Sequence, residues 1–183
     1  KLSGFKQECL FLNLEEGSIK KGFDGYYSLN GIEWLMESKS GLMNNTDVTH
    51  ENKVILAMKT LENNIAGRGR STSSGTPNNP WRNAYSHASH YDVGTSAEIR
   101  KNIKSLSNDF TNGHFHAIDE FNVIPCGTVY LSGVWIPPEH LNIHNKICSI
   151  SNQLKGNQIH VICVTNKSIK LFLSYLNQEE SNG

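Results

Sequence analysis

The sequence predicts an α/β fold (α+β), in which a mixed β-sheet is flanked by helices. Three observations support this class. Short apolar runs of strand length alternate with longer segments of helical periodicity. An Asn30-Gly31 pair separates two of the strand-like runs, which is the strongest local signal for a hairpin. No apolar run approaches the roughly eighteen residues of a membrane helix. Strands interspersed with helices are typical of a sheet with helices packed against it.

The first predicted elements are a strand and a hairpin. Residues 9–14 (CLFLNL) form a short apolar run of strand length. Residues 22–29 and 32–39 are predicted to pair as a hairpin, because Asn30 and Gly31 both tolerate the positive φ angles of a type I′ turn.

Further elements follow from helical periodicity and apolar runs. In residues 49–65, apolar side chains recur at helical spacing, and Asp47 or Thr49 is the expected N-cap. The rest of the chain is predicted to contain a flexible loop at 67–80, a helix at 96–110, a strand at 128–131, a helix at 139–154, a buried strand at 159–164 and a helix at 168–176.

Composition restricts the class of protein. The chain has 183 residues, enough for a single domain spanning 1–183, and its first residue is Lys1, so an upstream segment is expected to be missing. Its 17 basic and 17 acidic side chains balance, so any nucleic acid must be held by a local patch. The four cysteines lie far apart without a CxxC pair, and no signal peptide opens the chain. We therefore expect reduced thiols in a cytoplasmic protein that does not act on membranes.

The hairpin register brings two acidic residues together. With a two-residue turn at Asn30-Gly31, strand alternation pairs Asp24 with Glu37. The sequence predicts one face as the core surface, formed by Phe23, Tyr27, Leu29, Ile32, Trp34 and Met36. The face away from it is predicted to carry Asp24, Tyr26, Ser28, Glu33, Leu35, Glu37 and Lys39.

Asp24 and Glu37 are expected to repel each other when both carboxylates are ionised. Like charges directly opposite in a sheet are destabilising, by about 0.2–1 kcal/mol. Full solvation, one raised pKa, or a cation held between Asp24 and Glu37 would each relieve this cost. Mg²⁺ suits two carboxylate oxygens together with water and a main-chain carbonyl. Lys39 is predicted on the same face, where its ammonium would orient a water or a phosphate oxygen.

This pattern resembles the PD-(D/E)xK, or restriction-endonuclease-like, nuclease superfamily. The motif residues are Asp24 before a β-turn and Glu37-Ser38-Lys39 at the end of the following strand. The resemblance covers residues 22–65 and implies a Mg²⁺- or Mn²⁺-dependent hydrolase of phosphodiester bonds. It implies that Asp24 and Glu37 hold the metal, that the Ser38 carbonyl is a further ligand, and that Lys39 activates the attacking water.

The chain departs from the family pattern in two ways. Phe23 replaces the proline that names the motif, and the acid that many members place on a preceding helix has only Glu8 as a nearby candidate. Residues 34–41 (WLMESKSG) also resemble nucleases of bacterial restriction and antiviral defence. A homodimer, or a helicase or ATPase partner, is compatible with that resemblance.

Basic residues near the motif are candidate nucleic-acid contacts. Lys21 precedes Asp24, and Arg68, Arg70 and Arg82 lie in or beside the loop at 67–80. Backbone phosphates supply most non-specific affinity, so these side chains are expected to bind DNA. Ordinary solvated surface charge is the alternative interpretation.

Two other functions stay open. A non-catalytic member of the same fold would bind nucleic acid or a partner protein. A zinc protein would use the paired histidines, but no acid or cysteine in the sequence completes any of the sets. These pairs are His87 and His90, His114 and His116, and His140 and His144. We expect a Mg²⁺-dependent DNA endonuclease.

Overall fold

The computed structural model has the predicted α/β architecture. It describes residues 4–9, 12–13, 18–19, 22–43, 47–69, 75, 77–89, 94–132 and 135–167. Within this part of the chain, five strands form one mixed sheet in the order β1-β4-β5-β6-β7. These strands are β1 (Lys6–Cys9), β4 (Gly25–Leu29), β5 (Ile32–Leu42), β6 (Asn122–Leu131) and β7 (Ile162–Lys167). Two very short strands pair separately, β2 (Leu12–Asn13) with β3 (Ser18–Ile19).

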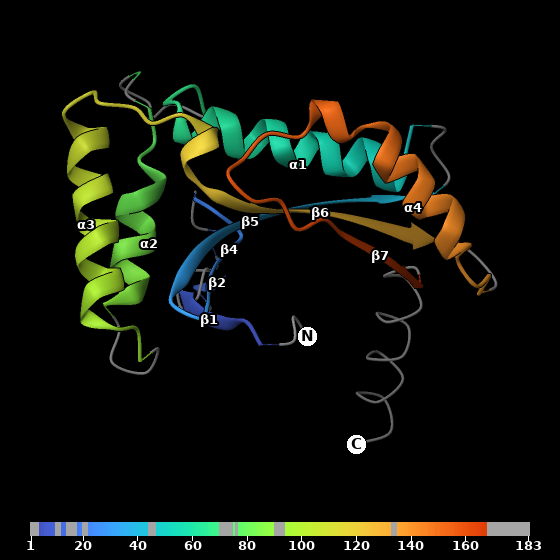
Figure 1. Ribbon diagram of the computed structural model, residues 1–183, viewed down its shortest axis with the longest axis horizontal. Helices are drawn as coiled ribbons and strands as arrows, with labels where there is room; N and C mark the ends of the chain where they lie inside the picture. Colours follow the sequence, from blue (N-terminus) through green and yellow to red (C-terminus); the bar gives the residue numbers. More distant parts are fainter. Residues whose placement is uncertain are drawn as a thin grey trace.

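The sheet is antiparallel on one side of β5 and parallel on the other. β1, β4 and β5 form an antiparallel set, whereas β5, β6 and β7 run parallel. The helices are α1 (His50–Ile65), α2 (Pro80–Ala88), α3 (Ala97–Thr111) and α4 (His140–Ser149). In Figure 1, α1 lies across β5 and β6, while α2 and α3 stand side by side at the other end of the molecule. None of the described helices is long and apolar enough to span a bilayer.

The predicted hairpin is confirmed. Asn30 has φ 51° and Gly31 has φ 79°, which are the positive values that a type I′ turn requires. Each pair in the β4–β5 ladder agrees with the predicted register, from Leu29 with Ile32 to Gly25 with Met36. The turn chemistry therefore fixes which residues of the two strands face each other.

The two helices predicted from apolar spacing begin at capping side chains. The Thr49 hydroxyl accepts a hydrogen bond of 3.2 Å from the N–H of Asn52 at the start of α1. Ser96 caps α3 in the same way, accepting from the N–H of Ile99 at 3.2 Å. Each hydroxyl satisfies a donor that the first helical turn leaves unpaired. Thr49, and not Asp47, is therefore the cap of α1.

The sequence prediction does not include helix α2. The predicted loop at 67–80 contains Pro80, which is the first residue of this helix. The Asn79 side chain accepts a hydrogen bond of 3.1 Å from the N–H of Arg82. Proline at the first helical position after an asparagine cap is a standard start signal. The buried indole of Trp81 packs on Phe23, with ring centroids 4.8 Å apart.

The two faces contain the predicted residues, but the prediction of which face carries the main core was wrong. The main core lies on the acid-bearing face, where Tyr26 and Leu35 are buried beneath α1, α2 and α3. The opposite face is only partly covered: Phe5 packs on Trp34, whereas Ile32 is 46% exposed. Both faces carry large apolar residues, so alternation alone does not identify the side that the helices cover. Glu37 is consequently a buried carboxylate and not a solvated one.

The C-terminal elements also differ from the prediction. The predicted buried strand at 159–164 starts as an isolated bridge at Ile159 and continues as β7, a half-exposed strand at the sheet edge. The predicted helix at 139–154 ends earlier, as α4 followed by a 3-10 turn at Ser151–Gln153. The predicted helix at 168–176 lies outside the described residues.

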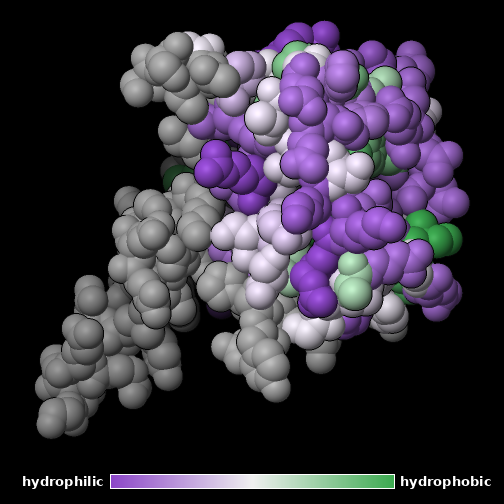
Figure 2. Space-filling view, turned by 90° about the vertical axis from the view of Figure 1, so that its left-hand side faces the viewer, coloured by the Kyte–Doolittle hydropathy of each residue, from purple (hydrophilic) through white to green (hydrophobic). Residues whose placement is uncertain are grey.

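The outer surface of the helical pair is mainly polar. α3 buries one face, which carries Ile99, Ile103, Leu106 and Phe110. Figure 2, which looks onto the side of the molecule where α3 lies, shows mainly hydrophilic side chains there. This distribution fits an amphipathic helix that covers a sheet and faces solvent on the other side.

Candidate functional site

Asp24 immediately precedes β4, where the ladder with β5 ends. The last pair in that ladder is Gly25 with Met36, so Asp24 and Glu37 occupy the next position. The carboxylate of Asp24 is exposed, and its Oδ2 accepts a hydrogen bond of 2.7 Å from the backbone N–H of Ser38. The side-chain carboxylate of Asp24 therefore takes the place of the next main-chain hydrogen-bond partner of β5.

Glu37 is buried beside Asp24. The residue is 3% exposed, and burial followed by the charge of Asp24 raises the pKa of Glu37 to about 7. Its contact with Lys39 and the backbone of Asp24 act in the opposite direction. Burial disfavours the charged form of a carboxyl group, and a neighbouring negative charge disfavours it further. The predicted proximity of the two acids is therefore found.

Lys39 pairs with only one of the two carboxylate oxygens of Glu37. The Lys39 ammonium donates a hydrogen bond to Glu37 Oε1. Glu37 Oε2 is buried and makes no hydrogen bond with any group in the described part of the chain. An unpaired buried carboxylate oxygen is costly, so this atom is where an added cation or donor would be most stabilising.

The main chain of Ser38 faces the same edge as Asp24. In a strand, the N–H and C=O of one residue point toward the same neighbouring strand. Because the N–H of Ser38 reaches Asp24, its carbonyl is directed to the β4 side, beyond the end of the β4–β5 ladder. The end of the β4–β5 ladder thus combines two carboxylates with a main-chain oxygen.

These groups fit a hard divalent cation. Mg²⁺ is usually held by one or two carboxylates, with water and phosphate oxygens completing its coordination. Asp24, Glu37 Oε2 and the Ser38 carbonyl would supply such oxygens. Among the described residues, no three His, Cys, Asp or Glu side chains form a group that could hold a metal. A cation here would therefore depend on the main chain, solvent and substrate for its remaining ligands.

Glu8, the candidate for a third acid, lies elsewhere. It is 1% exposed on β1, where Oε1 accepts a hydrogen bond of 2.7 Å from the Ser28 hydroxyl. Its Oε2 pairs with the Lys6 ammonium at 3.0 Å. Ser28 is four residues from Asp24 along the chain, about 13 Å at strand spacing. Glu8 is thus part of a separate polar cluster inside the core.

Two of the four predicted nucleic-acid contacts lie in the described part of the chain, and they belong to different helical segments. Arg68 follows the C-terminal end of α1, where its guanidinium lies 3.8 Å from Glu62. Arg82 is exposed in the first turn of α2. Lys21 and Arg70 lie outside the described residues.

Lys53 is a candidate that the sequence analysis missed. It lies in the first turns of α1, over Gly41, two positions beyond Lys39 on the same face of β5. A Cβ added at Gly41 would be 2.8 Å from Lys53 Cε and 3.0 Å from its Nζ. No carboxylate in the described part of the chain pairs with this ammonium. The helical periodicity of residues 49–65 places Lys53 next to the buried Val54 in α1. Only the fold shows that Lys53 covers β5.

The histidine pairs have different environments. His116 contacts Glu120 and Asp109, with its Nδ1 2.7 Å from Glu120 Oε2. On α4, His144 Nε2 lies 3.5 Å from Cys148 Sγ. His87 is buried in α2, and His90 lies outside the described residues. No zinc-type cluster occurs among the residues that the structure describes.

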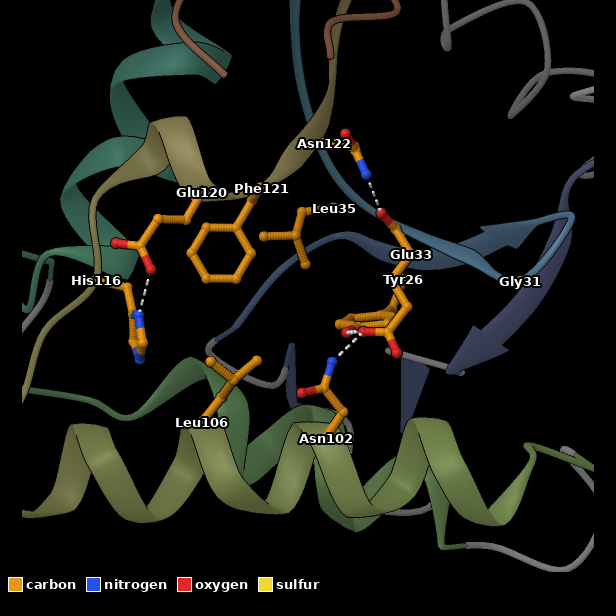
Figure 3. Close-up of a pocket in the computed structure, with 10 residues that line it drawn as sticks. All are labelled: Tyr26, Gly31, Glu33, Leu35, Asn102, Leu106, His116, Glu120, Phe121 and Asn122. Atoms are coloured by element: carbon orange, nitrogen blue, oxygen red, sulfur yellow. Dashed lines mark hydrogen bonds and ion pairs between the residues drawn. The ribbon is translucent and has the colours of Figure 1, made fainter. Parts of the chain in front are cut away.

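A second polar site includes Glu33, which lies four residues before Glu37 on β5. A cavity of about 420 Å³ is bounded by the hairpin, α3 and the segment that leads into β6. Figure 3 shows Glu33 and Glu120 on opposite sides of this cavity, with Leu35, Phe121 and Leu106 between them. Strand alternation places Glu33 on the same face as Asp24 and Glu37, but no sequence motif gives Glu33 a role.

Comparisons with family models, with curated proteins and with solved structures gave no match for this chain.

Proposed function

We propose that the protein is a Mg²⁺- or Mn²⁺-dependent endonuclease that hydrolyses phosphodiester bonds of DNA. The observation that carries this proposal is the proximity of Asp24, Glu37 and Lys39 where the β4–β5 ladder ends. The buried Glu37 has one oxygen paired with Lys39 and the other without a hydrogen-bond donor. The order of Asp24, β-turn, Glu37-Ser38-Lys39 and helix, together with a mixed sheet, supports a restriction-endonuclease-like core.

The chain's own residues have distinct tasks in this mechanism. Asp24, Glu37 Oε2 and the Ser38 carbonyl would hold the cation. When bound there, Mg²⁺ would polarise the scissile phosphate and lower the pKa of a water molecule. Lys39 fixes Glu37 Oε1 through its ammonium and positions the attacking water. The water oxygen bonds to phosphorus and gives its proton to solvent, the opposite P–O bond breaks, and the departing sugar oxygen takes up a proton from solvent.

The biological setting is part of the same proposal. The resemblance of residues 34–41 to defence nucleases supports a role in restriction or antiviral defence in the cytoplasm. A homodimer or a helicase or ATPase partner would extend the contact with DNA beyond the basic residues near this site.

A cleavage assay tests the proposal. Supercoiled plasmid and labelled single-stranded DNA are incubated with Mg²⁺, with Mn²⁺ or with EDTA. We expect cleavage with either metal, none with EDTA, and a loss of at least about a hundredfold in Asp24→Asn, Glu37→Gln and Lys39→Met. Glu139→Gln, an exposed acid without a side-chain cap bond, is the matched control.

Two results would contradict the proposal. Cleavage that survives in Glu37→Gln would show that the activity comes from another site or a contaminant. A folded wild-type protein that binds DNA but cleaves neither substrate with either metal would favour the non-catalytic alternative.

A further inference from the structure

The cavity between the hairpin and α3 has a carboxylate held in place at one end. Glu33 Oε2 accepts hydrogen bonds from the Tyr26 hydroxyl and, at 2.8 Å, from the Asn102 side-chain amide. Burial, followed by the charge of Glu33, raises the pKa of Tyr26 well above its ordinary value, so this hydroxyl stays a donor. No described residue donates to Glu33 Oε1. The carboxylate therefore has a fixed orientation and one free oxygen.

The opposite end of the cavity carries a second carboxylate. Glu120 Oε1 accepts a hydrogen bond of 2.8 Å from the N–H of Ala117, and Oε2 lies 2.7 Å from His116 Nδ1. These contacts lower the pKa of Glu120 and keep it ionised. Its side chain is 53% exposed, so a ligand reaches it from solvent.

Apolar side chains separate the two acids. Figure 3 shows Leu35, Leu106 and the ring of Phe121 in the middle of the cavity, between Glu33 and Glu120. This order, acid then apolar wall then acid, matches a ligand with a cation at each end of a methylene chain. Methylene groups are stabilised against apolar surface by about 0.8 kcal/mol each, and a cation near an aromatic ring gains further attraction.

From this arrangement we propose that the cavity binds a short aliphatic diamine, with one ammonium at Glu33 and the other at Glu120. The volume of about 420 Å³ falls in the usual range for small-ligand sites. Phosphate-bearing ligands are disfavoured, because two carboxylates would repel them. This site is therefore separate from the DNA contacts and does not depend on the proposed nuclease activity.

Calorimetry with the full chain tests this assignment. Putrescine and butylamine are titrated at about pH 8, where an ordinary histidine is neutral, in EDTA and without DNA. Butylamine has the same methylene chain but only one cation. We expect one putrescine per chain, with butylamine at least about tenfold weaker.

Variants locate the binding. Glu33→Gln retains an oxygen for Tyr26 and Asn102 but removes the charge, so putrescine affinity should fall about tenfold or more. Glu120→Gln should also weaken putrescine, and the Glu139→Gln control should bind as wild type. Circular dichroism establishes that each variant is folded.

Three outcomes would overturn the proposal. The proposal fails if putrescine binds wild type no tighter than butylamine, a comparison that needs no variant to fold. It would also fail if folded Glu33→Gln bound putrescine normally, or if wild type showed no binding up to about 10 mM putrescine. Each result is independent of cleavage, because metal and nucleic acid are absent.

Discussion

Glu37 is buried next to Asp24, and burial together with the Asp24 charge raises the pKa of Glu37 from 4.5 to about 7. The folded protein therefore binds a proton at Glu37 more tightly than the unfolded chain does. Stability from this proton is fully present below about pH 4.5 and is lost as the pH rises through 7. Above that pH the site contains two carboxylates and a single paired ammonium, Lys39.

The first prediction concerns this pH dependence. Glu37→Gln removes the titration, so it should be more stable than wild type at about pH 8, by roughly 1–3 kcal/mol. The two proteins should differ little at about pH 4.5, because Glu37 is then protonated. Urea unfolding at both pH values measures the difference. Glu139→Gln should follow wild type throughout, and a pH-independent difference for Glu37→Gln would refute the linkage.

Added Mg²⁺ should reverse the cost of the ionised pair. A cation that binds only the folded protein raises its stability by mass action. Because binding requires deprotonated ligands, Mg²⁺ should raise the Tm at about pH 8 and have little effect at about pH 5.5. Asp24→Asn should lose the response. A thermal scan with and without Mg²⁺ measures this, and an equal shift in Asp24→Asn would place the cation elsewhere.

The sequence was sufficient for the register of the hairpin but not for its environment. Asn30 and Gly31 define the turn, and period-two alternation then places Asp24 beside Glu37 without any tertiary information. Which face is buried depends on where the helices pack. Tyr26 on one face and Tyr27 on the other look alike in sequence, so the burial of Glu37 could not be derived.

The close approach of α1 to the sheet gives a third prediction. A Cβ at Gly127 would lie 2.7 Å from the backbone carbonyl oxygen of His50, so the start of α1 must shift. Gly127→Ala should therefore destabilise the protein by about 1–3 kcal/mol. At Gly41 the added Cβ meets side chains, of Lys53 and Val48, and Gly41→Ala should cost less. Thermal unfolding compares them, and the reverse order would contradict this packing.

The cavity residues were beyond sequence reasoning for a different reason. Glu33 and Glu120 are 87 positions apart, and no local pattern links them. Their placement depends on α3 and on the segment that enters β6 beside β5. Helix α2, in contrast, had a readable start at Asn79 and Pro80, which the Gly- and Ser-rich segment before it obscured.

The turn itself supplies a fourth prediction. Gly31 has φ 79°, and a Cβ added there would meet nothing within 4 Å. The cost of Gly31→Ala is therefore backbone strain alone, about 1–2 kcal/mol. Gly31→Asn should cost less, because asparagine tolerates the left-handed region. Chemical denaturation ranks the variants, and equal losses would argue against a type I′ turn.

Lys53 provides the last prediction, which depends on the proposed nuclease function. Its ammonium lies over Gly41, next to Lys39 along the same face of β5, with no carboxylate partner in the described part of the chain. Such a group would contact a DNA phosphate near the cleavage site. Lys53→Met should weaken DNA binding for all sequences and reduce the slope of log affinity against log salt by about 1. The control is Lys146→Met, because that ammonium is 3.5 Å from the Glu51 carboxylate. Fluorescence anisotropy in EDTA over a range of KCl measures both, and an unchanged slope in Lys53→Met would remove Lys53 from the DNA-binding surface.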